Sequence, residues 1–180
     1  MSGFKSANLI GTINSNSQTN LSIISSFIHA GSNPPCFACI FRPPKVERHT
    51  FENIIKTKFF TVNHVSKSFI DKAHQTSARY PRDFSEFHET QLTEEYLQDF
   101  YAPFVKESPI KLALEYEEHY DIKLNNTVFL LAKLRFIYIA PHLLNEDGFV
   151  SLDEAGVVCI SGLDSYHSTS QIVRLPYAKP

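Results

Sequence analysis

Residues 20–53, NLSIISSFIHAGSNPPCFACIFRPPKVERHTFEN, carry the features that decide the fold. A hydroxyl-rich turn leads through a Pro-Pro pair at 34–35 into an apolar run over 36–41, and a basic loop then precedes a helix start at 49–50. A strand followed by basic residues and the amino end of a helix is an arrangement that binds phosphate. The free N–H groups of the first helical turn point outward, and the helix dipole favours negative charge. The stretch therefore predicts a buried strand with an anion site at its end.

The basic loop supplies the candidate phosphate ligands. Its polar side chains are Arg42, Lys45, Arg48, His49 and Thr50. Spacing alone leaves two interpretations open, a solvated turn and a phosphate site. Arg42 is the best candidate because it directly follows the buried run, whereas we expect Lys45 and Arg48 to be solvated. Asn53, one helical turn further, either bonds a ligand or faces water.

A second polar group precedes the apolar strand. It consists of Asn20, Ser22, Ser25 and Ser26. Such residues routinely bond their own backbone in tight turns, so by themselves they indicate no ligand. Their interest lies in their position next to the basic loop.

The composition describes one globular domain over residues 1–180. The chain is 43% hydrophobic and 13% aromatic, enough to bury a core without disulfides. A formal charge of -2 and a pI near 6.4 predict no general attraction for nucleic acid or an anionic membrane. The N-terminal segment lacks a signal-peptide pattern, and Lys133 and Arg135 interrupt the most apolar stretch, so we expect no membrane span and a cytoplasmic location.

The cysteines and histidines predict no metal site. Cys36 and Cys39 form a CxxC pair, but only Cys159 remains as a third thiol, and zinc needs more ligands at set spacing. Positions three apart on a strand also point to opposite faces. We interpret the pair as core thiols and the eight scattered histidines as non-ligating.

The periodicity predicts many short strands and a few helices. Strands are expected over 9–14, 19–24, 36–42, 59–63, 110–114, 127–139 and 157–160. Helices are expected over 50–58 with Thr50 as cap, over 66–76, and over 93–100. Residues 25–33 are ambiguous between a helical turn and a loop, 76–89 read as a loop, and the chain from Ser161 reads as an exposed tail. This pattern favours a mainly β fold, a small barrel with appended helices, over βαβ repeats. No GxGxxG or phosphate loop is present.

Four segments resemble the flavin reductase-like, FMN-binding split-barrel family. In the family's order they are TNLSIISSFIHAGSNPPCFACIFR (19–42), HTFENIIKTKFFTVN (49–63), TSARYPRDFSEFHE (76–89) and GLDSYHSTSQIVRLPYAKP (162–180). No single segment is specific, but four in register make a chance similarity improbable. The chain departs from the family in a first hairpin turn without glycine and in beginning close to its first strand, whereas relatives often carry an N-terminal extension.

The resemblance implies a six-stranded Greek-key barrel with peripheral helices, forming a homodimer with FMN, rather than FAD, in a groove between subunits. Carried over by position, the backbone and hydroxyls of 20–26 would lie along the isoalloxazine, and the basic loop and helix start would hold the phosphate. The implied cofactor contacts are Asn20, Leu21, Ser22, Ser25, Ser26, Arg42, His49, Thr50 and Asn53.

The implied activity is hydride transfer from NADH or NADPH to FMN, followed by passage of electrons to an acceptor or an oxygenase partner. The cofactor carries this chemistry, so no catalytic acid, base or nucleophile is required. Tyr166 and His167 are expected to shape the pocket where nicotinamide or substrate stacks. The alternative is a non-catalytic protein that stores or senses FMN on the same fold. A domain that has lost flavin is a third alternative.

Overall fold

The computed structural model describes residues 3–43 and 47–179. Its strands are β1 (Lys5–Ser6), β2 (Asn8–Ile13), β3 (Thr19–Ile24), β4 (Phe27–Ser32), β5 (Pro35–Phe41), β6 (Phe59–His64), β7 (Glu94–Glu95), β8 (Phe104–Val105), β9 (Ile110–Ile122), β10 (Thr127–Ile139), β11 (Val158–Ser161) and β12 (Ser165–Ser168). The helices are α1 (His49–Thr57), α2 (Ile70–Gln75) and α3 (Glu86–Thr90), with 3-10 turns η1 (Lys67–Phe69) and η2 (Pro141–Leu143).

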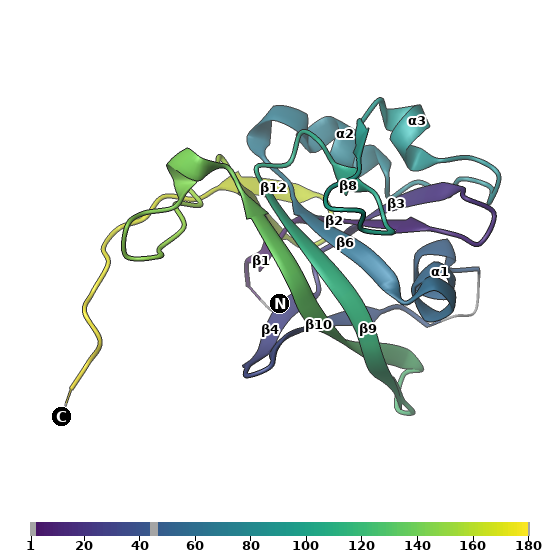
Figure 1. Ribbon diagram of the computed structural model, residues 1–180, viewed down its shortest axis with the longest axis horizontal. Coiled ribbons are helices and arrows are strands. Elements are labelled where there is room, and N and C mark those ends of the chain that lie inside the picture. Colours follow the sequence, from purple (N-terminus) through teal and green to yellow (C-terminus); the bar gives the residue numbers. More distant parts are fainter. Residues whose placement is uncertain (1–2, 44–46, 180) are drawn as a thin grey trace.

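One strongly curved sheet forms the body of the molecule (Figure 1). Its strands follow the order β3-β2-β6-β9-β10-β5-β4, and every neighbouring pair is antiparallel. The sheet does not close, because β3 and β4 remain as its two edges. The predicted fold class, mainly β with a few helices in a split barrel, is confirmed. Six of the predicted strands lie in this sheet, and β4 adds a seventh at one edge.

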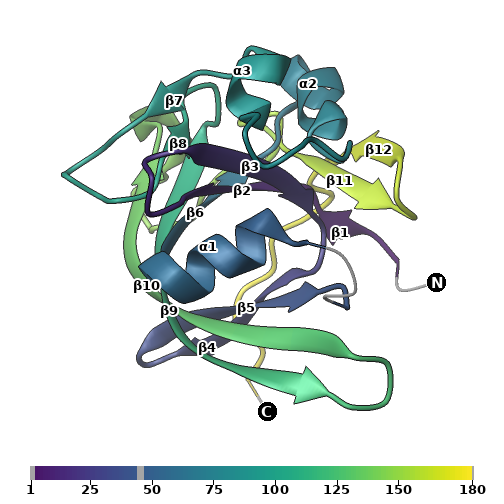
Figure 2. The same cartoon turned by 90° about the vertical axis from the view of Figure 1, so that its right-hand side faces the viewer.

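Helix α1 bridges the two ends of the open sheet. It packs against β2 and β3 through the fully buried Ile54. Its Phe51 ring lies 5.4 Å from the ring of Phe41 in β5. Figure 2 shows the helix lying between β2 and β3 on one side and β4 and β5 on the other. The start of α1 therefore lies near both β3 and the end of β5.

A second layer covers the outer side of β2 and β3. Helices α2 and α3 pack there through Ala73 and Phe87, in a core cluster that also holds Leu9 and Leu21. The C-terminal hairpin β11–β12 joins this layer, and β11 pairs with β1 near the other end of the chain. In Figure 2 the hairpin lies beside α2. The turn between β11 and β12 is thereby held close to the end of β3.

The helix predicted over 93–100 is wrong. Glu94 and Glu95 form β7 and pair with β8, and Gln98 and Asp99 have positive φ angles of 49° and 54°, which no right-handed helix contains. The Thr93 N–H also donates to the Glu107 carboxylate at 3.1 Å. Long-range pairing has overridden a local helical pattern.

Several predicted boundaries also need correction. Residues 27–32, within the ambiguous segment, form β4 because β5 offers them a partner strand. The segment read as a loop over 76–89 contains most of α3, and the segment read as a tail contains β12, which pairs with β11. Helix α1 begins at His49, and the Thr50 hydroxyl donates to Asn20 Oδ1 at 2.8 Å, so Thr50 is no cap.

The described residues contain no helix long and apolar enough to cross a membrane. Their three cysteines are free thiols; Cys39 is buried, and Cys36, near the start of β5, is half-buried. Within 3–43 and 47–179, no group of three or more His, Cys, Asp or Glu side chains is placed to hold a metal ion.

His64, at the end of β6, is expected to make the folded protein less stable in acid. Burial lowers its pKa from 6.5 to about 4, and its Nδ1 has no hydrogen-bond partner in the described part of the chain. Because the unfolded chain binds a proton at higher pH than the folded one, stability is full above pH 6.5 and falls as the pH drops towards 4. The loss should reach about 3 kcal/mol.

Urea denaturation at a series of pH values measures this effect. His64→Gln is expected to flatten the profile between pH 6.5 and 4. His88→Gln is the control, since the His88 side chain is 88% exposed, and it should keep the wild-type slope. An unchanged slope in His64→Gln would show that another group titrates.

Candidate functional site

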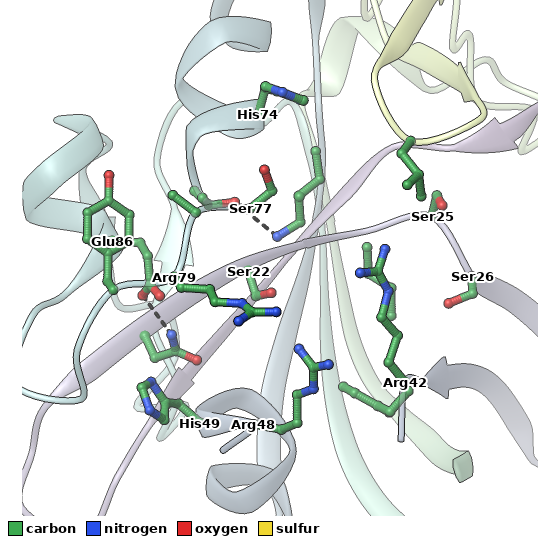
Figure 3. A pocket seen from close by; sticks show the side chains of 18 of the residues that line it. Ser22, Ser25, Ser26, Arg42, Arg48, His49, His74, Ser77, Arg79 and Glu86 are labelled. Carbon is green, nitrogen blue, oxygen red and sulfur yellow. Dashed lines mark hydrogen bonds between the residues drawn. The ribbon is translucent and has the colours of Figure 1, made fainter. Parts of the chain in front are cut away.

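A cavity of about 750 Å³ opens where β3, β5 and α1 converge, a size typical of ligand sites. Its walls come from β3 and the turn after it, the end of β5, and the start of α1. Residue 74 of α2, residues 76–82 after this helix, and the β11–β12 turn complete them. Figure 3 shows side chains from these separate elements around one hollow. Segments remote in sequence thus meet at one site.

Three arginines, Arg42, Arg48 and Arg79, line this cavity, and none of them has a carboxylate partner within the described residues. Arg82, which also lines it, is different because it pairs with Glu52 at 2.5 Å. In Figure 3 the side chains of the three arginines extend into the same part of the hollow. We call Arg42, Arg48 and Arg79 the arginine cluster.

Arg48 lies in surroundings that disfavour its positive charge. Its Nε is buried and has no hydrogen-bond partner among the described residues. Burial lowers the pKa of its guanidinium, and the positive charges of Arg42 and Arg79 lower that pKa further. A bound anion would satisfy the buried N–H and neutralise the mutual repulsion. The expectation that Arg48 is solvated therefore holds for only part of its side chain, because Nε is buried.

Local structure fixes where Arg48 and Arg42 stand. Arg48 is the residue before α1, and its backbone N–H donates to Glu52 Oε1 at 3.2 Å while its carbonyl accepts from the Glu52 N–H at 2.9 Å. Arg42 directly follows β5. The loop after α2 brings in Arg79, and its first turn is closed by the Ser77 N–H donating to the His74 carbonyl at 2.9 Å.

The free edge of β3 is held by side chains from the second layer. Glu86 Oε2 accepts from the Leu21 N–H at 2.9 Å and from Asn20 Nδ2 at 2.6 Å. Thr76 Oγ1 accepts from the Ile23 N–H at 3.0 Å. These bonds occupy the outward N–H groups of the strand. The Ser22 and Ser25 side chains line the cavity next to it, as Figure 3 shows.

A buried polar network lies behind this wall. Asn20 Oδ1 accepts from the Thr50 hydroxyl at 2.8 Å, and Asn53 Nδ2 donates to Thr12 Oγ1 at 3.1 Å. Thr12 Oγ1 lies 3.4 Å from Asn20 Oδ1 and closes the network. Burial raises the pKa of Glu86, and the N–H donors of Leu21 and Asn20 partly oppose this rise. The network fixes β3 against α1 and α3.

The structure brings most of the sequence-predicted cofactor residues to the cavity. Those that line it are Asn20, Ser22, Ser25, Ser26, Arg42 and His49. Leu21 is fully buried, and Thr50 and Asn53 lie in the network behind the wall. The Ser26 hydroxyl is engaged, donating to the Ile40 carbonyl at 2.8 Å. Lys45 lies outside the described residues.

Tyr166 and His167 do not line the cavity. The Tyr166 hydroxyl instead lies 3.0 Å from Nδ1 of His74, which does line it. His167 Nε2 lies 2.8 Å from Ser161 Oγ, and its ring packs edge-on against Phe4. Alternation along β12 places the two side chains on opposite faces of the hairpin.

Sequence reasoning missed several polar residues of the site, among them His74, Ser77, Arg79 and Glu86. Ser77, Arg79 and Glu86 fall in the segment TSARYPRDFSEFHE, which carries part of the family resemblance but lacks any recognisable spacing for a ligand. Its two arginines were the available signal. Nothing local indicates that this loop folds back beside α1.

Comparison with known proteins gives one family match. The family model described as flavin reductase like domain matches residues 1–146. A candidate flavin reductase with a split barrel domain from Shewanella frigidimarina NCIMB 400 is 51% identical, with a TM-score of 0.95 over 99% of this chain and 88% of the other. The match extends through β11 and β12, beyond the residues of the family model.

More distant structures share the fold. Nitrilotriacetate monooxygenase component B from Bacillus cereus is 19% identical, with a TM-score of 0.86 over 97% of this chain and 89% of that one. Flavoredoxin of Desulfovibrio vulgaris is 17% identical, with a TM-score of 0.86 over 98% and 93% of the two chains. These two likenesses show that the fold is shared.

Proposed function

Because the chain belongs to the flavin reductase-like family, whose chemistry is flavin-linked oxidation and reduction, we propose that its cavity binds FMN and that the protein transfers hydride from NADH or NADPH to it. When bound, FMN supplies a ring that accepts hydride and passes electrons to an acceptor. The chain's own residues bind the cofactor, orient it and set the electrostatics around it.

The arginine cluster carries this proposal. A phosphate monoester has a charge of about -1.5 to -2 near neutral pH and three acceptor oxygens. Arg48 offers a buried N–H without a partner, and Arg42 and Arg79 offer further guanidinium donors with no carboxylate bound. The terminal phosphate of FMN offers these donors more charge and more free acceptor oxygens on one phosphorus than the diester pyrophosphate of FAD does. His49 completes the same wall.

The β3 wall is proposed to hold the isoalloxazine ring. The hydroxyls of Ser22 and Ser25 line the cavity, and neither has a hydrogen-bond partner among the described residues. They can donate to ring oxygens and nitrogens and stabilise negative charge on the reduced ring. Thr50 and Asn53 act indirectly in this proposal, because they hold the Asn20 side chain in place.

We further propose that the chain is one domain acting as a cytoplasmic homodimer with FMN at the subunit interface. The pairing of β1 with β11 joins the first strand to the C-terminal hairpin, which fits a single domain. The C-terminal segment leaves the body in Figure 1 and exposes Ile172 by 95%, Leu175 by 77% and Tyr177 by 91%. A second subunit would bury such apolar side chains. The free thiols fit a reducing compartment.

The test is size-exclusion chromatography of the full chain mixed with FMN, with light scattering and visible absorbance, followed by a nicotinamide oxidation assay. We expect FMN to elute with a particle of twice the chain mass, and NADH or NADPH to be oxidised when an acceptor is supplied. FMN binding without nicotinamide oxidation would support the storage or sensing alternative. Absence of FMN binding would overturn the proposal.

A further inference from the structure

Glu52, in the first turn of α1, uses both oxygens of its carboxylate. Its Oε1 accepts from the Arg48 backbone N–H at 3.2 Å, and its Oε2 accepts from Arg82 Nη2 at 2.5 Å. The backbone adds another bond between neighbours, because the Glu52 N–H donates to the Arg48 carbonyl at 2.9 Å. One carboxylate therefore joins the residue that precedes α1 to the loop that follows α2.

The loop after α2 has few other bonds to the rest of the protein. Side chains near its two ends, Thr76 and Ser85, bond to β3. Over residues 77–84, the hydrogen bonds found among the described residues are local to the loop and the end of α2, apart from those of Arg82. Arg79 lies in this span, three positions before Arg82. The position of Arg79 therefore depends on the ion pair that Arg82 forms.

The negative charge of Glu52 lies beside a site for an anion. Burial acts to raise the pKa of its carboxyl, but the bonds from the Arg48 N–H and the Arg82 guanidinium outweigh burial and hold that pKa below its usual 4.5. An unpaired carboxylate at this wall would weaken the binding of a phosphate. Here the charge of Arg82 opposes that of Glu52, so the carboxylate can join two segments at little electrostatic cost to the site.

The two segments that Glu52 joins both carry members of the arginine cluster. Arg48 bonds to Glu52 directly through its backbone, and Arg79 is connected to it through the short span that ends at Arg82. A phosphate needs donors from both segments at fixed positions around its oxygens, because charge-assisted hydrogen bonds depend on distance and direction.

We propose that Glu52 is a positioning residue of the anion site, whose carboxylate holds Arg48 directly and Arg79 through Arg82 so that both arginines reach one phosphate. This inference rests on the proposed function, since the phosphate is that of FMN. Arg82 acts in it through Glu52 and is not itself a phosphate ligand.

Glu52→Gln separates positioning from charge. Glutamine keeps an accepting oxygen and the length of the side chain, but it loses the charge that holds the Arg82 guanidinium. FMN affinity, measured by flavin fluorescence titration, should fall roughly twofold to fivefold, although a negative charge has been removed beside a phosphate. Riboflavin affinity should stay at the wild-type value, because riboflavin has no phosphate. Glu52→Ala should lose more FMN affinity, since it also releases the Arg48 N–H.

Glu47→Gln is the matched control for the charge. Glu47 lines the same cavity, its side chain is 73% exposed, and its carboxylate lies 4.0 Å from the Arg82 guanidinium. The substitution removes the same charge without breaking the bonds of Glu52, so FMN affinity should match or slightly exceed that of the wild type. A similar gain in Glu52→Gln would show that Glu52 acts only as a charge and would overturn the inference.

Arg82→Gln tests the other half of the ion pair. It should lose FMN affinity by the same factor as Glu52→Gln, and the double variant should lose no more than either single variant, because both substitutions break one interaction. Arg82→Lys keeps the charge and should retain most of the affinity. Additive losses in the double variant would show that Arg82 binds the phosphate itself, contrary to the inference.

The same titrations distinguish failure of this inference from failure of the proposed function. If the wild-type protein binds FMN and Glu52→Gln binds it as tightly, the inference fails while the proposed function stands. The same holds if Glu52→Gln loses affinity for FMN and riboflavin to the same extent, since a general loosening of the fold would then explain the loss. If the wild-type protein binds no FMN, the proposed function itself fails.

Discussion

Arg48→Ala is expected to weaken FMN binding by about thirtyfold or more and to leave the fold intact. The guanidinium is partly buried, and its Nε lacks a partner among the described residues, so a phosphate oxygen there would form a charge-assisted hydrogen bond shielded from water. Truncating one partner of such a pair costs about 2–5 kcal/mol, and each 1.4 kcal/mol is a factor of ten. Removal also relieves repulsion from Arg42 and Arg79, so thermal stability should not fall.

Flavin fluorescence titration measures this effect, with riboflavin as the key comparison. Riboflavin lacks the phosphate, so its affinity should be the same for wild type and Arg48→Ala. Arg48→Lys should recover only part of the FMN affinity, because lysine lacks the planar fork of donors. Arg135→Ala is the matched control on the exposed face of β10, where Arg135 pairs with Glu115 at 3.0 Å. Equal losses for FMN and riboflavin would rule out a phosphate contact.

Glu86→Ala is expected to have the second large effect, a loss of about 2–5 kcal/mol in the free energy of unfolding. The substitution leaves two buried donors, the Leu21 N–H and Asn20 Nδ2, without the oxygen that accepts from both. Each unsatisfied buried donor costs about 1–3 kcal/mol. Because these bonds hold the free edge of β3, FMN affinity should fall in the same variant.

Urea denaturation of Glu86→Ala and Glu86→Gln at several pH values tests this role. Gln keeps an accepting oxygen and should lose much less stability than Ala. Burial raises the pKa of Glu86 above its usual 4.5, so the folded state holds the proton more tightly, and wild-type stability falls as the pH rises from 4.5 to the folded pKa. The stability of wild type relative to Glu86→Gln should therefore decrease over that range.

The control for Glu86 is Glu89→Ala on the same helix. Among the described residues, the side-chain partner of the Glu89 carboxylate is the adjacent His88. This variant should change stability by less than about 0.5 kcal/mol. A Glu86→Ala protein as stable as the Glu89→Ala protein would show that the two bonds to β3 contribute nothing.

The strands were predictable because their signal is local. Alternating or continuous apolar residues over 19–24, 36–42 and 127–139 fit a half-buried or buried strand whatever the partner. The family resemblance then supplied the split-barrel topology, which periodicity cannot provide. The wrong predictions concern segments whose structure depends on a partner strand. Residues 93–100 have a helical pattern, but β8 pairs with their first part.

The candidate site divides in the same way. The sequence of residues 20–53 places a strand end, a basic loop and a helix start together, which brings cations and free N–H groups close to one another. Spacing alone leaves a solvated turn and a phosphate site both open. Arg79, Glu86 and His74 join it from another part of the chain. Their sequence positions reveal nothing about that neighbourhood.

By itself, the sequence determined a mainly β architecture and the segment that carries the candidate anion ligands, since both depend on residues close together in the chain. Only the tertiary structure decided which cations remain unpaired. Arg82 finds Glu52, whereas Arg48 is partly buried between Arg42 and Arg79 without a carboxylate among the described residues. Burial and charge pairing are properties of surroundings that assemble from distant segments, and at this site they distinguish the arginine proposed to bind a ligand from one that pairs with a carboxylate of the fold.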